Sequence, residues 1–95
     1  MKTVWLPRAI QDLETIRDYI KQENPQAASK VARAIINTVS LIEEHPYIGQ
    51  ASELDEIFEK EVAGLPYLIP YRVVEDRLEI LRVFHEAQQR PKEWN

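Results

Sequence analysis

The last third of the chain alternates apolar and polar residues with the period of two that is typical of β-strands. Residues 67–74 and 77–85 are rich in tyrosine, isoleucine, valine and phenylalanine, and the dipeptide Glu75-Asp76 separates them. We therefore expect a β-hairpin, whose short turn fixes the register of its two strands. In that register Arg72 lies opposite Glu79.

The predicted register places the side chains of the hairpin on two faces, because neighbours along a strand point in opposite directions. The apolar face, which we expect to join the core, carries Tyr67, Ile69, Tyr71, Val73, Leu78, Ile80, Arg82 and Phe84. The mixed face, which is suited to meet a partner, carries Leu68, Pro70, Arg72, Val74, Arg77, Glu79, Leu81, Val83 and His85.

Two residues of the hairpin do not fit this simple pattern. Arg82 falls among core residues, where an unpaired guanidinium group is costly, so it needs a carboxylate, backbone carbonyls or an exposed sheet edge. The acids of the stretch Glu53–Glu61 are the candidate partners. Pro70 has no N–H to donate, so we expect it at a β-bulge or where that N–H would point away from a ladder.

The residues before the hairpin predict a short strand and two helices. Lys2–Leu6 alternates polar and apolar residues up to Pro7, which suits a strand. Two apolar stripes at helical spacing follow, one of Ile10, Leu13, Ile16 and Ile20 and one of Ala28, Val31, Ala32, Ile35, Val39 and Ile42. Asn24-Pro25 separates the helices as an N-cap followed by a helix-starting proline, and His45-Pro46 ends the second helix.

The segment between the second helix and the hairpin is expected to add one strand. Pro46–Leu54 is predicted as a loop, in which Gly49 can take a positive φ, and Ile57–Val62 as a strand. The resulting order is an N-terminal strand, a helical hairpin and a three-stranded antiparallel meander. It predicts an α+β fold with the helices packed on one face of the sheet. With 95 residues the chain suits a single domain, which we assign to residues 1–95.

The charge of the chain is unevenly distributed. The net charge is −4, and residues 51–64 alone carry one lysine against five acidic residues. Nucleic-acid binding needs clustered lysine and arginine, so this balance argues against a simple DNA or RNA binder. The chain has no cysteine and two isolated histidines, so we expect no disulfide, metal site or cofactor. No segment resembles a membrane span or signal peptide, so we expect a soluble, cytoplasmic protein that makes no membrane contact.

A series of short matches, in order along almost the whole chain, resembles one known family. The matches are Trp5 with Ala9 and Asp12-Leu13, Tyr19-Ile20, Asn24-Pro25-Gln26-Ala27-Ala28, His45-Pro46 with Gly49, Leu65-Pro66-Tyr67, Tyr71-Arg72-Val73 and Ile80-Leu81-Arg82-Val83-Phe84-His85. Together they resemble the RelE/ParE superfamily of toxins from type II toxin–antitoxin modules, and its ParE-like branch more than its RelE-like branch. The resemblance implies a small toxin that arrests growth when its antitoxin is degraded.

The resemblance to the ParE-like branch implies a protein that binds and inhibits DNA gyrase. A cognate antitoxin would neutralise it, and operator DNA would be bound only through that antitoxin. The residues expected to contact the antitoxin are Ile16, Ile20, Ile35, Val39, Tyr67 and Tyr71. The residues expected to contact the target are Arg72, Arg77, His85, Arg90, Lys92 and Trp94.

The alternative is a RelE-like endoribonuclease that cuts mRNA in the ribosome. Its candidate catalytic residues are His85, Arg82 and Arg72, since the chemistry needs an acid or base and cations beside the phosphate. RelE-like members carry lysines on the middle strand, where this chain has Glu59 and Glu61. Carboxylates at these places repel the phosphate, so we expect a binding inhibitor and not an enzyme.

The chain also lacks other charges that its relatives tend to carry. ParE-like relatives tend to have arginine where this chain has Gln50 and Phe58, and RelE-like relatives have arginine where it has Leu68. Two interpretations follow for the missing ParE-like charges: either the target interface lies elsewhere, or the toxicity is weakened. A separate alternative to both functions is a non-toxic relative that serves as an antitoxin decoy or as a plain interaction protein.

Overall fold

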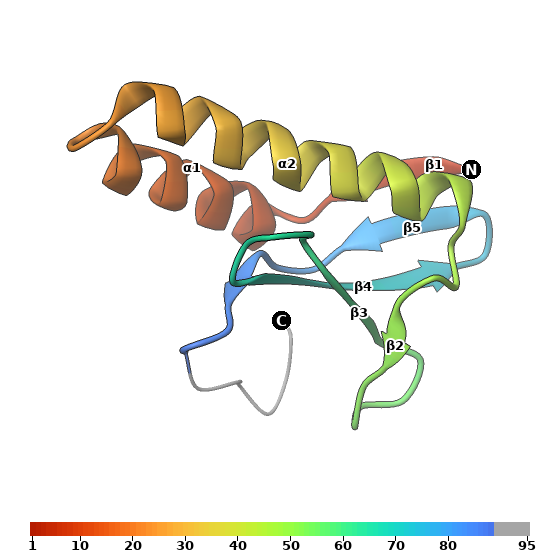
Figure 1. The fold of residues 1–95 in the computed structure, drawn as a ribbon. Coiled ribbons are helices and arrows are strands. Elements are labelled where there is room, and N and C mark those ends of the chain that lie inside the picture. Colours follow the sequence, from red (N-terminus) through yellow and green to blue (C-terminus); the bar gives the residue numbers. More distant parts are fainter. Residues whose placement is uncertain (89–95) are drawn as a thin grey trace.

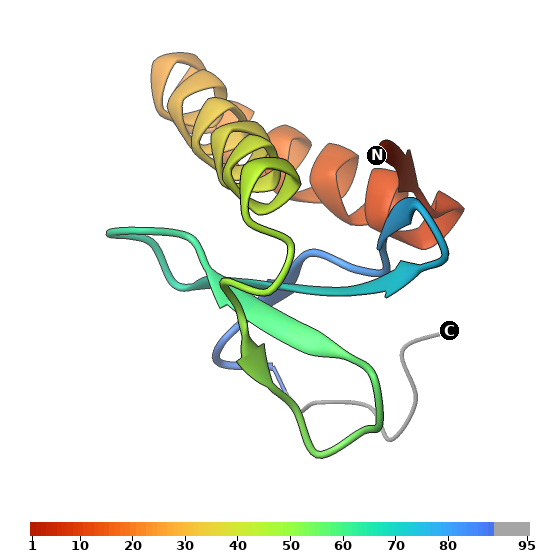
Figure 2. The same ribbon diagram turned by 90° about the vertical axis from the view of Figure 1, so that its right-hand side faces the viewer.

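The computed structural model describes residues 1–88. In chain order its elements are β1 (Lys2–Trp5), α1 (Pro7–Lys21), α2 (Pro25–Glu44), β2 (Gln50–Ala51), β3 (Phe58–Glu61), β4 (Tyr67–Val74), β5 (Arg77–Ile80) and β6 (Phe84–His85). The two helices pack side by side over one face of a six-stranded sheet (Figure 1). In the view of Figure 2 the helices lie on one side of the sheet and the loop between β2 and β3 on the other. The predicted α+β fold is therefore confirmed.

Local sequence explains where the helices begin. α1 starts with Pro7 at its first position, where the missing N–H costs no hydrogen bond. At the start of α2, the side chain of Asn24 accepts a hydrogen bond from the N–H of Ala27 at 3.1 Å, as expected of an N-cap. Neither helix in residues 1–88 is long and apolar enough to cross a membrane.

The sheet has the strand order β1-β5-β4-β3-β2, and β6 pairs with the first residues of β4. β3, β4 and β5 form the predicted antiparallel meander, while β1 lies parallel to β5 at the edge. Val74 pairs with Arg77 and Arg72 pairs with Glu79, so the predicted register of the hairpin is confirmed. Glu75 in the turn has a φ of 58°, a left-handed conformation.

The second strand of the hairpin is interrupted at residues 81–83, where the sequence pattern predicted a continuous strand. Before the interruption Tyr71 pairs with Ile80, and after it Leu68 pairs with Phe84. The pairing has shifted by one residue, so the chain accommodates one extra residue there, as in a β-bulge. The prediction that the two faces continue unchanged to the end of this strand is therefore wrong.

The bulge exchanges the faces of the residues that follow it. Val83, predicted on the mixed face, is buried in the main core against the helices. Phe84, predicted on the apolar face, instead packs with Leu68 and Leu81 in a second, smaller cluster. The extra residue at the centre of the interruption is Arg82, which explains why it did not fit the core pattern.

Pro70 is buried and lies beside this bulge. Its carbonyl oxygen accepts a hydrogen bond from the N–H of Leu81 at 3.0 Å. Because the N–H and C=O of one residue point to the same side of a strand, the N–H that proline lacks would point at the bulge. The prediction that this proline sits at a bulge is confirmed.

Gly49 is needed for close packing and not for its φ. Its N–H donates a hydrogen bond to the hydroxyl oxygen of Tyr71 at 2.9 Å. A Cβ at this position would lie 2.7 Å from that hydroxyl oxygen and 2.9 Å from the backbone oxygen of Glu59. The left-handed glycine in the described residues is Gly64, with a φ of 75°, so Gly49 does not use the positive φ that a glycine can take.

Candidate partner-binding surfaces

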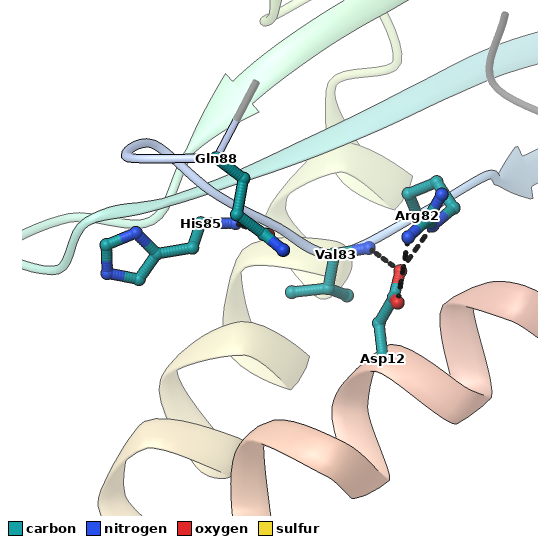
Figure 3. Close-up of polar contacts among 5 residues, drawn as sticks. All are labelled: Asp12, Arg82, Val83, His85 and Gln88. Carbon is teal, nitrogen blue, oxygen red and sulfur yellow. Dashed lines mark hydrogen bonds and ion pairs between the residues drawn. The ribbon is translucent and has the colours of Figure 1, made fainter. Parts of the chain in front are cut away.

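Arg82 is bound by Asp12 of α1, 70 residues earlier in the chain (Figure 3). Nε and Nη2 of Arg82 donate hydrogen bonds to the Asp12 carboxylate at 2.6 and 3.1 Å. The N–H of Val83 donates a third bond to the same carboxylate at 3.0 Å. The predicted partner of Arg82 in the stretch Glu53–Glu61 is therefore wrong, because α1 supplies the carboxylate.

This contact decides what Arg82 can do. The hydrogen bond to Asp12 raises the pKa of Arg82 and outweighs burial, which lowers it. The side chains of Arg82 and Asp12 are only 17% and 18% exposed, so each neutralises the other in a largely dry setting. Arg82 thus links the first helix to the C-terminal segment, and its positive charge is neutralised by Asp12.

Arg72 and Arg77 share one carboxylate on the outer face of the sheet, which is the face away from the helices. Nε of Arg72 donates to Oε1 of Glu79 at 2.6 Å, and Nη2 of Arg77 donates to Oε2 at 3.1 Å. The hydrogen bond from Arg72 lowers the pKa of Glu79, and the bond from Arg77 adds to this effect against burial, which raises it. The predicted pair of Arg72 with Glu79 is confirmed, and the structure adds a second arginine to it.

His85 ends β6, and its ring packs edge-on against Tyr67 with the ring centroids 5.3 Å apart. The N–H of Ala87 donates to Nδ1 of His85 at 3.0 Å, and the backbone N–H of His85 donates to Oε1 of Gln88 at 3.1 Å. The bond from Ala87 thus engages one of the two ring nitrogens that could take up a proton. In Figure 3 the ring points away from Arg82.

The three residues considered for nuclease chemistry are not brought together. Arg82 is held against α1, whereas Arg72 lies on the outer face of β4. His85 pairs with Tyr67, which precedes Arg72 along β4 by five residues, or about 17 Å of extended strand. Within residues 1–88, no three histidine, aspartate or glutamate side chains are grouped so that they could hold a metal ion.

β3 carries carboxylates where the resemblance places lysines in the nucleases. Glu59 and Glu61 pair with residues of β4 that face away from the helices, which puts both carboxylates on the outer face. Phe58 points to the other side and stacks on Tyr71, with the ring centroids 5.8 Å apart. Phe58 therefore extends the core at a position where ParE-like relatives tend to carry arginine.

Four of the six residues predicted to contact an antitoxin are buried in the main core. Ile35, Val39, Tyr67 and Tyr71 are between 0% and 9% exposed. They cannot form a surface contact in this fold, so this part of the prediction is corrected. The apolar stripe of a helix that covers a sheet faces the sheet, and these four residues follow that rule. Ile16 and Ile20 of α1 are half-buried and stay accessible.

The surface between α2 and β1 holds a cavity of about 300 Å³ that the sequence pattern did not predict. It is lined by Thr3, Trp5, Leu13, Ile36, Val39, Ser40 and Glu43. Ile36 is 48% exposed, whereas Ile35 and Val39, four residues apart on one face of α2, are buried against the sheet. The Thr3 hydroxyl is shielded from solvent and has no hydrogen-bond partner in the described part of the chain. The pair of consecutive isoleucines is the sequence signal for this surface.

The residues predicted to contact a target fall in three places. Arg72 and Arg77 lie together on the outer face of the sheet, and His85 lies at the other end of β4. The remaining three predicted contacts, Arg90, Lys92 and Trp94, lie outside the described residues.

Comparison with known proteins identifies relatives along nearly the whole chain. The profile of the family described as "ParE toxin of type II toxin-antitoxin system, parDE" matches residues 3–90. The putative toxin Y4kP of Sinorhizobium fredii is 38% identical over 88 residues, which cover 93% of this chain and 91% of that protein. Toxin RelE2 of Caulobacter vibrioides is 35% identical over 89 residues, which cover 92% of this chain and 97% of that protein.

The fold agrees with these sequence matches. The solved structure "Chromosomal ParDE TA system from P. aeruginosa" superimposes with a TM-score of 0.83 and 25% sequence identity. The superposition covers 90% of this chain and 95% of that one. The names of the relatives include both ParE and RelE, so they agree on a toxin but not on one branch of the superfamily. The chain belongs to the ParE toxin family of type II toxin–antitoxin systems, within the RelE/ParE superfamily.

Proposed function

We propose that this toxin, with residues 1–95 as its single domain, acts by binding DNA gyrase and not by cutting mRNA. The observation that carries the proposal is the ion pair of Arg82 with Asp12. Cleavage next to a phosphate needs cations that are free to stabilise the developing negative charge. The charge of Arg82 is compensated by Asp12 of α1, and that of Arg72 by Glu79.

The surroundings of His85 support the same conclusion. One of the two ring nitrogens that could serve as a base accepts a hydrogen bond from the Ala87 backbone, so a general-base role of that nitrogen would require the bond to break. Glu59 and Glu61 add negative charge to the face that RNA would have to approach. A toxin with this surface is better suited to occupy a protein than to bind a transcript.

Membership of the family implies a cognate antitoxin. We place its binding on the helical side of the molecule, where the cavity beside Ile36 and the accessible Ile16 and Ile20 offer apolar surface. An antitoxin segment that folds on this surface would give up conformational entropy as it binds. Because the toxin has a net charge of −4, we expect operator DNA to be bound only through the antitoxin. We expect the toxin to act in the cytoplasm.

The second candidate function is a ribosome-dependent endoribonuclease. The name of the relative RelE2 favours it, because that protein is 35% identical to this chain over 89 residues. In this alternative His85 and Arg82 would act on the ribose and the phosphate.

One experiment separates the two functions. After induction of the toxin, plasmid supercoiling by gyrase is measured beside primer extension on total mRNA. We expect supercoiling to be inhibited and transcripts to remain intact, and co-expression of the antitoxin to restore supercoiling. Cleavage of transcripts at codons with normal supercoiling would overturn the proposal. Absence of growth arrest, with antitoxin binding retained, would instead indicate an antitoxin decoy.

A further inference from the structure

The outer face of the sheet gathers three cations from three strands. The parallel pairing of β1 with β5 places Lys2 next to Arg77. The antiparallel pairing of β4 with β5 places Arg72 opposite Glu79, two residues further along β5. Residues paired across strands point to the same side of a sheet, so these side chains share one face. This cationic group occurs in a chain whose net charge is −4.

One buried carboxylate organises the two arginines. The Glu79 side chain is 10% exposed and binds both guanidinium groups, whose own side chains are 43% and 40% exposed. One carboxylate can neutralise only one arginine. Glu79 therefore leaves one of the two positive charges of Arg72 and Arg77 uncompensated. The exposed acids Glu75 and Asp76 stand at the tip of the hairpin, but in the described residues the ion pairs of both arginines are with Glu79.

The guanidinium groups are also well placed to bind something else. A guanidinium has five N–H donors in one plane, and the hydrogen bonds to Glu79 use one donor of each arginine. The unused donors are held in a defined orientation at a surface that is about two-fifths exposed. Planar forks of this kind bind carboxylates in a bidentate manner.

We propose that this platform, formed by Arg72, Arg77 and Lys2 around Glu79, binds carboxylate side chains of an extended acidic segment in a protein partner. Glu79 is the positioning residue, because it holds both guanidinium groups without touching the partner. This proposal rests on the proposed function, because gyrase inhibition requires a protein partner and the platform would recognise carboxylates on that partner.

A nucleic acid fits this face less well than an acidic polypeptide. A nucleic-acid backbone presents one charge after another and needs cations along its whole path. The same face carries Glu59 and Glu61 on β3, which would repel the phosphates that follow the first one. A polypeptide can place one or two carboxylates on the platform and neutral residues elsewhere.

The direct test is a titration of the full-length toxin with two synthetic peptides, one alternating aspartate with valine and one alternating asparagine with valine. Binding is followed by NMR through the Nε–H signals of the arginines, with inorganic phosphate as a third probe. We expect the aspartate peptide to shift the signals of Arg72 and Arg77, with a much weaker effect of the other two probes. Equal responses to both peptides, or a stronger response to phosphate, would overturn the proposal.

Two substitutions sharpen the test. Arg77→Gln should weaken binding of the aspartate peptide at least fivefold, whereas Arg17→Gln should leave it unchanged, because Arg17 lies on α1 with a side chain that is 50% exposed.

Glu79→Gln removes a negative charge, so simple attraction predicts tighter binding of the acidic peptide. A platform that Glu79 positions predicts weaker binding, by about threefold or more, in a protein that circular dichroism shows to be folded. Tighter binding would contradict the role of Glu79.

The role of the platform toward the target is measured separately. Arg77→Gln should raise the toxin concentration needed for half-inhibition of gyrase about fivefold, with antitoxin affinity unchanged. If the unmodified toxin leaves gyrase active, the proposed function fails, while the peptide titration still decides whether the platform binds carboxylates. If the toxin inhibits gyrase and Arg77→Gln has no effect, the platform is not the target-binding surface.

Discussion

Oδ2 of Asp12 lies 2.6 Å from Nε of Arg82 and 3.0 Å from the backbone N of Val83, so one carboxylate of the first helix holds the β-bulge near the end of the chain. The bulge exchanges the faces of the residues that follow and sends Phe84 to the second cluster. The path of the C-terminal segment therefore depends on an aspartate that is 70 residues away.

Replacement of Asp12 by alanine should destabilise the fold by about 2–4 kcal/mol, because it leaves a largely buried guanidinium and a backbone N–H without their acceptor. The measurement is urea unfolding followed by circular dichroism. Asp18→Ala is the matched control, since the Asp18 side chain is 69% exposed and lies 4.0 Å from Arg17, and it should cost little. Equal effects of the two substitutions would show that the contact with Arg82 is not important for stability.

Gly49→Ala should destabilise the protein by about 1–3 kcal/mol, because the new methyl group would overlap the Tyr71 ring and the Glu59 carbonyl. Tyr71→Phe should cost about 1 kcal/mol through loss of the hydrogen bond to the Gly49 N–H. Thermal unfolding measures both changes.

Tyr19→Phe is the control for removal of a hydroxyl group, because Tyr19 is 73% exposed and should tolerate the change. The double variant Gly49→Ala/Tyr71→Phe should lose less stability than the sum of the single variants, since the hydroxyl oxygen is the atom closest to the new methyl group. Strict additivity would argue against this overlap.

Stability should fall in acid partly through Glu79. The pKa of Glu79 is lower in the folded state than its ordinary value of 4.5, chiefly because of the hydrogen bond from Arg72. A carboxyl group with a lowered pKa stabilises the fold above the unfolded pKa, and this contribution is lost as the pH falls through the folded pKa. Urea unfolding at a series of pH values from 7 to about 3 tests this, and Glu79→Gln should make the acid loss smaller. An unchanged acid loss in Glu79→Gln would assign the effect to other groups.

Toxicity should survive the change His85→Ala, because the ring of His85 packs on Tyr67 and lies away from Arg82. Growth after induction is the measurement, with circular dichroism to confirm folding. His45→Ala serves as the control, since it removes the chain's other histidine, which caps α2. Complete loss of toxicity in folded His85→Ala alone would point to catalysis.

Removal of residues 90–95 should reduce toxicity, because we expect Arg90, Lys92 and Trp94 to contact the target.

Local pattern was sufficient for most of the architecture. The apolar stripes, the Asn24-Pro25 boundary and the Glu75-Asp76 turn predicted the helical hairpin and the register that pairs Arg72 with Glu79. These features depend on contacts between residues that are close in sequence or joined by a tight turn, and such contacts follow from local geometry. The position of Pro70 at a bulge belongs to the same group, since a proline inside a strand leaves few alternatives.

Only the tertiary structure decided which carboxylate holds Arg82, where the strand is interrupted and which isoleucines stay on the surface. A period-two pattern cannot reveal one extra residue, because the alternation before and after a bulge looks regular on its own. The pairing of Lys2 with Arg77 likewise comes from a parallel contact between distant segments. The sequence by itself therefore determined the two helices, the central strands and the apolar faces of the hairpin as far as the bulge. The charged surfaces were decided by the packing of α1 and β1 against the hairpin, since ion pairs depend on distances that only the folded chain sets.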